Sequence, residues 1–148
     1  KCLRHLVKKG IESITIVNRS LDKAESLVSI FGGTAVAFGG CLDAMVDVDI
    51  VITSTGCPKI IIDRRDVETV MMRRPARPLV IVDIAVPRNV ASETNEIPGV
   101  HLHNIGDLEE TVRENIRFRE QELDMCWAII EVKLAEFEAR ASVMAEVV

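Results

Sequence analysis

The turn Val17-Asn18-Arg19-Ser20 carries the side chains with the clearest chemical use in this sequence. Arg19 can hold a phosphate through two parallel hydrogen bonds, and Ser20 and the N-terminus of a following helix can add donors. Lys23, one helical turn further on, adds positive charge. The turn lacks the carboxylate that a site for an unphosphorylated ribose usually places there. Asn18 and its neighbours therefore predict a site for a ribose 2′-phosphate; the alternative is an ordinary turn that leads into a helix.

A second candidate site is the segment that begins Thr53-Ser54-Thr55-Gly56. It follows a predicted buried strand, and loops at the carboxyl ends of parallel strands line the ligand crevice of α/β sheets. Gly56 permits close approach of the backbone to a ribose or a nicotinamide. We therefore expect Ser54, Thr55 and Gly56 to contact the other half of a dinucleotide.

A third feature is Asp83, which interrupts the most apolar run of the chain. A buried carboxylate must be hydrogen-bonded or paired. We expect Asp83 to accept hydrogen bonds from nearby backbone N–H groups or to pair with Arg88, rather than to catalyse.

The sequence predicts neither a metal site nor a catalytic nucleophile. The three histidines form no cluster with carboxylates or cysteines, and no two of the four cysteines have the C-x-x-C spacing. Such cysteine usage is typical of reduced thiols in a cytoplasm, and we expect each cysteine to be a small buried residue.

Composition narrows the class of protein further. The chain has 148 residues, of which 48% are hydrophobic, enough for the core of one domain with an appendage. Its net charge of −5 argues against a broad basic surface for nucleic acid. Apolar runs are too short to cross a membrane, and the first residues lack the pattern expected of a signal peptide.

Predicted strands and helices alternate along the first hundred residues, beginning with the end of a helix that stops at Gly10. The strands are expected at residues 13–17, 34–38, 49–53, 79–84 and 101–105, and the helices at residues 20–31, 42–46 and 64–73. Alternation with short connections predicts a Rossmann-like, doubly wound parallel sheet covered on both faces. In that topology the first strand and its glycine loop would precede Lys1, so we expect the chain to be a fragment.

A long helix is predicted from about residue 107 to the end of the chain, with Asp107 as its N-cap and Glu110 completing a capping box. Its apolar residues recur at steps of three, four or seven, without glycine or proline. Such a helix favours a partner over folding back on its own domain. The expected domains are residues 1–106, for cofactor binding, and residues 107–148, for dimerisation.

These motifs together resemble the glutamyl-tRNA reductase family. The resemblance rests on residues 14–20, 24–25, 44–56, 97–100 and 107–108, and most specifically on Val82-Asp83-Ile84-Ala85-Val86-Pro87-Arg88. The resemblance implies an NADPH-dependent oxidoreductase that reduces tRNA-bound glutamate to glutamate-1-semialdehyde, in the synthesis of porphyrins and other tetrapyrroles.

The resemblance also implies that catalysis and cofactor binding belong to different domains. The nucleophilic cysteine and the contacts with glutamyl-tRNA would belong to an N-terminal catalytic domain that this chain lacks, so the chain alone is expected to be inactive. NADPH would bind here, the long helix would form a homodimer, and the aminomutase that consumes the semialdehyde is an expected partner. The protein would be cytoplasmic, without a membrane partner.

Two other functions remain open from the sequence. An Asn-Arg-Ser turn also occurs in shikimate-dehydrogenase-like NADP oxidoreductases, although these do not need so long a helix. A non-enzymatic, NADP-sensing dimerisation module is the other alternative.

Overall fold

The computed structural model describes residues 2–11 and 13–145, with side chains described for residues 2–11, 13–135 and 137. It divides into two compact units, Lys1–Ile105 and Gly106–Val148. The first unit is a Rossmann-like α/β fold with parallel strands, as the sequence predicts, and the second is a long helix.

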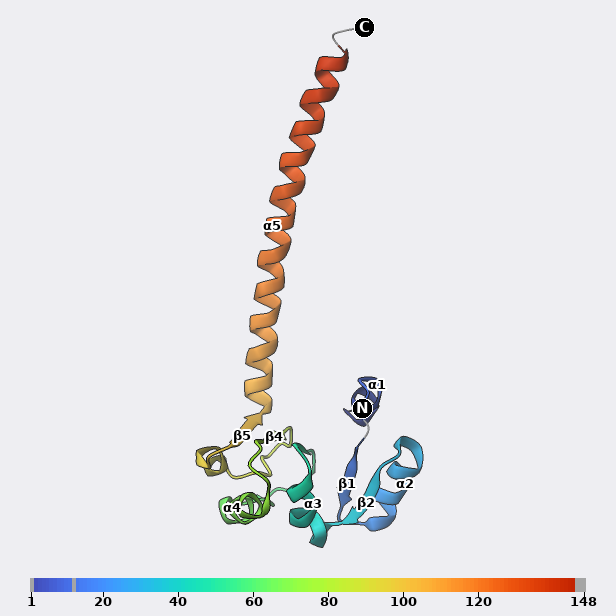
Figure 1. The fold of residues 1–148 in the computed structure, drawn as a ribbon, viewed down its shortest axis with the longest axis vertical. Coiled ribbons are helices and arrows are strands. Elements are labelled where there is room, and N and C mark those ends of the chain that lie inside the picture. Colours follow the sequence, from blue (N-terminus) through green and yellow to red (C-terminus); the bar gives the residue numbers. More distant parts are fainter. Residues whose placement is uncertain (1, 12, 146–148) are drawn as a thin grey trace. The chain divides into compact units, whose positions relative to one another are not determined.

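Strands and helices alternate through the first unit (Figure 1). The strands are β1 (Thr15–Asn18), β2 (Thr34–Ala37), β3 (Ile50–Thr53), β4 (Leu79–Asp83) and β5 (Val100–Asn104). The α-helices are α1 (Cys2–Lys8), α2 (Leu21–Phe31), α3 (Cys41–Asp47) and α4 (Arg64–Arg73), with 3₁₀ turns η1 (Phe38–Gly40) and η2 (Ser92–Glu96). Every strand and helix predicted in this unit is present, with ends displaced by one or two residues.

The strands form two sheets rather than the single sheet expected. β1 pairs with β2, and β3, β4 and β5 form a three-stranded sheet in that order. All three pairings are parallel. In the Rossmann strand order, the first strand lies between the strands that correspond to β1 and β3. The gap between the two sheets therefore lies between β1 and β3, where the Rossmann strand order places the first strand.

The main core lies on one face of the three-stranded sheet. Residues of β4 alternate in burial, so that Leu79, Ile81 and Asp83 share the buried face. Leu79 and Ile81 pack in one cluster with residues of α3, α4 and β5: Met45, Val67, Val70 and Val100, together with Ile62, Val90 and Ile97 of the connecting segments. Asp83 is buried because it lies on the core face at the end of its strand.

Helix ends in the first unit follow local chemistry. Asp63 caps α4, since its side chain accepts from the backbone N–H of Asp66 while the Asp66 side chain accepts from that of Asp63. Ser20 stands at the N-cap of α2, but its side chain makes no capping hydrogen bond. Its backbone N–H instead donates to Oδ1 of Asn18, at 3.1 Å, which closes the turn between β1 and α2.

Helix α5 (Ile105–Ala145) forms the second unit, and Figure 1 shows it as one continuous helix. The predicted capping box at Asp107 and Glu110 is wrong. α5 begins at Ile105, directly after β5, and Asp107 lies inside its first turn, where the Asp107 carbonyl accepts from the hydroxyl of Thr111. Among the residues described, no helix combines the length and apolar composition needed to cross a bilayer.

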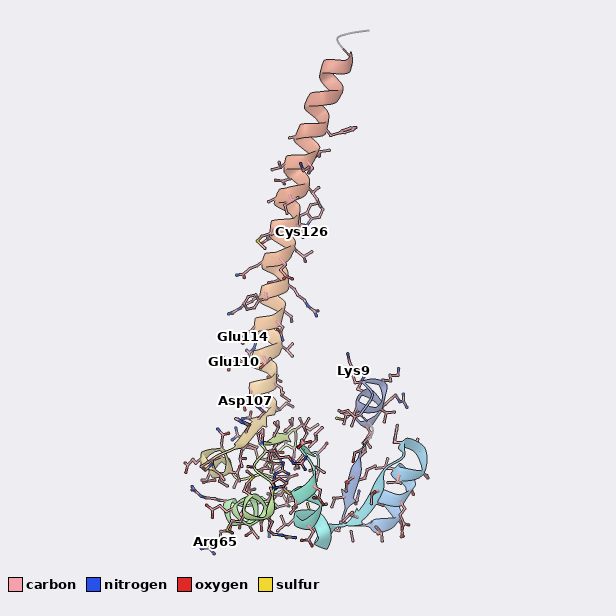
Figure 2. All side chains as sticks on the ribbon, viewed as in Figure 1. Lys9, Arg65, Asp107, Glu110, Glu114 and Cys126 are labelled. Carbon is pink, nitrogen blue, oxygen red and sulfur yellow. The ribbon has the colours of Figure 1, made fainter. Side chains whose placement is uncertain are left out.

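None of the four cysteines is buried, so the expectation of small buried residues was wrong. Cys2 and Cys126 are exposed, and Cys41 and Cys57 are half-buried. Figure 2 shows Cys126 on α5. Burial and the neighbouring charge of Asp66 raise the pKa of the Cys41 thiol above its ordinary value, which disfavours a reactive thiolate there.

Candidate functional site

The first group of predicted site residues lies where β1 passes into α2. Asn18 ends β1, Arg19 and Ser20 form the turn, and Lys23 lies in the first turn of α2. Arg19 and Lys23 are both exposed, and no ion pair holds either of them in the part of the chain that the structure describes. Two solvated cations at a helix N-terminus can receive an anion without first breaking an internal contact.

An acidic side chain reduces the net positive charge of this turn. Asp22 lies beside Lys23 in the first turn of α2 and is exposed. It offsets one of the two positive charges, so the attraction for a phosphate depends on Arg19 and Lys23 together. Because Ser20 donates its backbone N–H to Asn18, the hydroxyl of Ser20 is the group left to reach a ligand.

The second group follows β3 at the carboxyl edge of the three-stranded sheet. The register places Thr53, Asp83 and Asn104 side by side, at the ends of β3, β4 and β5. Beyond Thr53, the exposed residues Ser54, Thr55 and Gly56 form a loop with Cys57, which we call the 54–57 loop. The two groups of predicted residues thus end strands of two separate sheets.

Asp83 is the buried carboxylate at the centre of this edge, only 1% exposed. Its Oδ1 accepts from the Thr53 hydroxyl at 2.7 Å and from the backbone N–H of Ala85 at 3.1 Å. Its Oδ2 accepts from the backbone N–H groups of Asn89 and Val90, at 2.8 and 3.0 Å. The expectation of backbone partners is confirmed, and these four donors, rather than Arg88, satisfy the carboxylate.

These hydrogen bonds decide the charge of Asp83. Burial raises its pKa, but the hydrogen bonds from Thr53, Val90, Ala85 and Asn89 together outweigh burial and hold the pKa below its ordinary value. Asp83 is therefore an anion at neutral pH that fixes the loop after β4. It is a structural group at the edge of the candidate site rather than an acid or base.

The lowered pKa of Asp83 predicts a loss of stability in acid. An unfolded-state aspartate has a pKa of about 3.9, so the folded state binds the Asp83 proton more weakly than the unfolded state does. The contribution is complete above that value and disappears as the pH falls through the lower folded-state pKa. We expect the difference between the free energies of unfolding of the wild type and of D83N to be constant above about pH 5 and to shrink as the pH falls from 5 to 2 in urea titrations. A constant difference between them across this range would contradict the assignment.

Asn89 is a site residue that the sequence analysis missed. It is fully buried, and its side-chain amide contacts three residues of the segment after β3. An asparagine two residues after a proline has the composition of an ordinary turn, and its partners lie about thirty residues away in the sequence. No local pattern indicated it. Among the described residues, no cluster of three potential metal ligands occurs.

The sequence of this chain is similar to those of two groups of oxidoreductases. The model of the family described as shikimate/quinate 5-dehydrogenase matches residues 1–111. A glutamyl-tRNA reductase of Maridesulfovibrio salexigens is 38% identical over 133 residues, which are 90% of this chain and 30% of that protein. The glutamyl-tRNA reductase of Thermodesulfovibrio yellowstonii is also 38% identical, over 91% of this chain and 32% of its own length.

Solved structures give the same result. Glutamyl-tRNA reductase from Methanopyrus kandleri superimposes with a TM-score of 0.74 at 33% identity, over 82% of this chain and 31% of its own. The nucleotide-binding domain of glutamyl-tRNA reductase from Thermoplasma volcanium gives a TM-score of 0.55 at 15% identity, over 80% of this chain and 93% of its own, which shows the shared fold. The chain spans about a third of the length of the curated relatives that it matches.

Proposed function

The chain belongs to the shikimate/quinate 5-dehydrogenase family, and we propose that it is the NADPH-binding domain of a glutamyl-tRNA reductase. The observation that carries this proposal is the length of the match. The similarity to glutamyl-tRNA reductases covers 133 residues, whereas the family model ends at residue 111. The similarity therefore includes part of α5 as well as the α/β unit. That extent favours a reductase over a shikimate-dehydrogenase-like enzyme or a non-enzymatic sensor.

The whole protein would reduce glutamate esterified to its tRNA and release glutamate-1-semialdehyde, in tetrapyrrole synthesis in the cytoplasm. A cysteine of another domain would form the acyl-enzyme, since this chain contributes no nucleophile to the proposal. NADPH, when bound, supplies the hydride for the reduction. Residues 1–106 would bind the cofactor, and residues 107–148 would join two copies through α5. Glutamyl-tRNA would bind the other domain, and the aminomutase that uses the semialdehyde would be a partner.

The residues of this chain fit the two halves of the cofactor. Arg19 and Lys23 are cations beside the N-terminus of α2, and among the described residues neither has an ion pair to break. This arrangement suits a 2′-phosphate. The 54–57 loop lies at the carboxyl edge of the other sheet, where Ser54 and the backbone of Gly56 are exposed. These groups would orient the nicotinamide half, and the buried Asp83 network would hold the loops around it.

Arg19→Ala is expected to lower the preference for NADPH over NADH. Loss of a charge-assisted, bidentate contact with a phosphate costs a factor of about 10–100 in affinity, whereas NADH has no phosphate to lose. The measurement is the KM for each cofactor in the full-length gene product, with glutamate charged on its tRNA as substrate. Arg65→Ala is the matched control, because Arg65 is an exposed arginine on α4, labelled in Figure 2.

Two outcomes would count against the proposal in different ways. An unchanged ratio of KM values in Arg19→Ala would remove Arg19 from the phosphate site. A folded, full-length protein that binds NADPH but does not reduce charged glutamate would instead favour the small-molecule dehydrogenase.

A further inference from the structure

Asn89 uses every hydrogen-bonding group of its side chain on the segment after β3. Its Oδ1 accepts from the Thr55 hydroxyl at 2.6 Å. Its Nδ2 donates to the carbonyl oxygens of Cys57 and Lys59, at 3.0 and 3.1 Å. Asn89 is 0% exposed, whereas its partners belong to an exposed segment, so each of these bonds is half-buried. Asn89 therefore fixes the 54–57 loop at both its middle and its end.

The backbone of Asn89 extends this connection to β4. Its N–H donates to Asp83 at 2.8 Å, and its carbonyl accepts from the backbone N–H groups of Ile61 and Ile62, at 2.8 and 3.1 Å. Ile62 is 2% exposed and belongs to the main core. The position of Asn89 is thus set by a buried anion on one side and by the core on the other, which makes it a rigid anchor for a loop that is itself exposed.

The Thr55 hydroxyl has no proton left to donate to a ligand. It donates to Asn89, and it accepts from the backbone N–H of Cys57 at 3.1 Å. A hydroxyl has one proton to donate, and here that proton is committed inside the protein. Thr55 therefore acts on a bound molecule through the shape of the 54–57 loop. Ser54 and Gly56, exposed on either side of it, are the residues free to contact the molecule.

We propose that Asn89 is a positioning residue that orders the 54–57 loop, through Thr55, for the nicotinamide half of the cofactor. This inference rests on the proposed NADPH site and adds a residue and a mechanism to it. Ordering the loop before binding removes an entropic cost that a mobile loop would incur when the cofactor binds. The effect is expected on the nicotinamide half of the cofactor alone. The residues proposed for the 2′-phosphate belong to the end of β1 and to α2, and β1 is in the other sheet.

The test compares two ligands and two substitutions in the full-length gene product. Thr55→Val removes the hydroxyl with little change of shape, and Thr55→Ser retains it. NADPH contains both halves of the cofactor, whereas 2′,5′-ADP contains only the adenosine half with its phosphate. Titration by calorimetry gives a Kd for each ligand. Thr69→Val is the matched control, because the Thr69 hydroxyl is exposed on α4 and donates to the backbone of its own helix.

Thr55→Val is expected to weaken NADPH binding about three- to tenfold, as for loss of one hydrogen-bonded support, and to leave the Kd for 2′,5′-ADP unchanged. Thr55→Ser restores NADPH binding, and Asn89→Ala combined with Thr55→Val weakens binding no more than Asn89→Ala alone. A purely structural role would lower the melting temperature while changing both ligands equally or neither, and that result would overturn the proposal.

Different results would contradict the proposed NADPH site and the positioning role of Asn89. A wild-type protein that binds neither ligand would refute the proposed NADPH site. A wild type that binds both, together with a Thr55→Val variant that binds NADPH equally well, would refute only the positioning role of Asn89.

Discussion

Asp83→Asn is expected to destabilise the protein by about 2–4 kcal/mol, although the two side chains have the same shape. Each carboxylate oxygen accepts two hydrogen bonds. An amide can place its NH₂ group toward the backbone N–H groups of Asn89 and Val90, or toward that of Ala85. Either choice leaves at least one buried N–H facing another donor, and the remaining bonds lose the assistance of the negative charge.

The measurement is the free energy of unfolding from urea titrations followed by circular dichroism. Asp63→Asn is the matched control: it makes the same chemical change at the exposed N-cap of α4, where asparagine caps as well as aspartate. We expect that variant to lie within about 0.5 kcal/mol of the wild type. Equal stability losses in the two variants would show that the Asp83 network does not stabilise the fold.

Arg74→Ala is expected to lower the free energy of unfolding by about 3–5 kcal/mol, because it removes one buried guanidinium that donates to four carbonyl groups at once. The Arg74 side chain is 0% exposed. Its Nη1 donates to the carbonyl oxygens of Met45, Val46 and Val48 at the end of α3, and its Nη2 donates to that of Pro78 before β4. A single guanidinium thus joins the ends of α3 and α4 to the start of a core strand.

The charge of Arg74 is compensated within the same region. Burial, followed by the nearby charge of Arg77, lowers the pKa of Arg74, and Asp49 and Asp47 oppose that shift. The group remains a cation, since an arginine keeps its proton in proteins. Arg74→Lys is expected to recover part of the loss, because an ammonium cannot reach carbonyls on both sides as a planar guanidinium does.

Arg73→Ala is the control for Arg74. Its side chain is half exposed and pairs with Asp43 at 2.7 Å, and such exposed pairs contribute about 0–1 kcal/mol. Urea titrations of the three variants would test the difference between two adjacent arginines. A loss below 1 kcal/mol in Arg74→Ala would show that water replaces the guanidinium at these carbonyls.

Local patterns were sufficient to predict the strands and helices of the α/β unit, but not its division into two sheets. The alternation of short strands with helices, and the glycine that ends the first helix, are signals that depend only on neighbouring residues, and the structure has the corresponding elements. The requirement that a buried carboxylate be hydrogen-bonded also predicted what Asp83 does before its partners were known. The start of α5 was wrong because Asp107 and Glu110 have the spacing of a capping box, whereas the helix continues directly from β5 and begins two residues earlier.

Partners distant in sequence account for what the sequence did not reveal. Asn89 contacts residues 30–34 positions away, and Arg74 reaches carbonyls up to 29 positions away. Nothing in the neighbouring residues distinguishes this arginine from Arg73, or this asparagine from one in a solvated turn. Only the register of β3 with β4, and the packing of α3 against α4, determine which of them is buried.

The distribution of buried side chains also has a consequence for how the α/β unit fluctuates. The buried residues of the main core all lie between Met45 and Val100, whereas Ile16 and Ala24 are the buried apolar residues described between residues 2 and 37. In native proteins, a segment that buries little apolar surface has a low free energy of local opening, so it can open while the rest stays folded. Hydrogen exchange at β1, α2 and β2 should accordingly be governed by local opening. At the proposed site, binding of the adenosine half of the cofactor would slow this local opening and so protect β1, α2 and β2 from exchange.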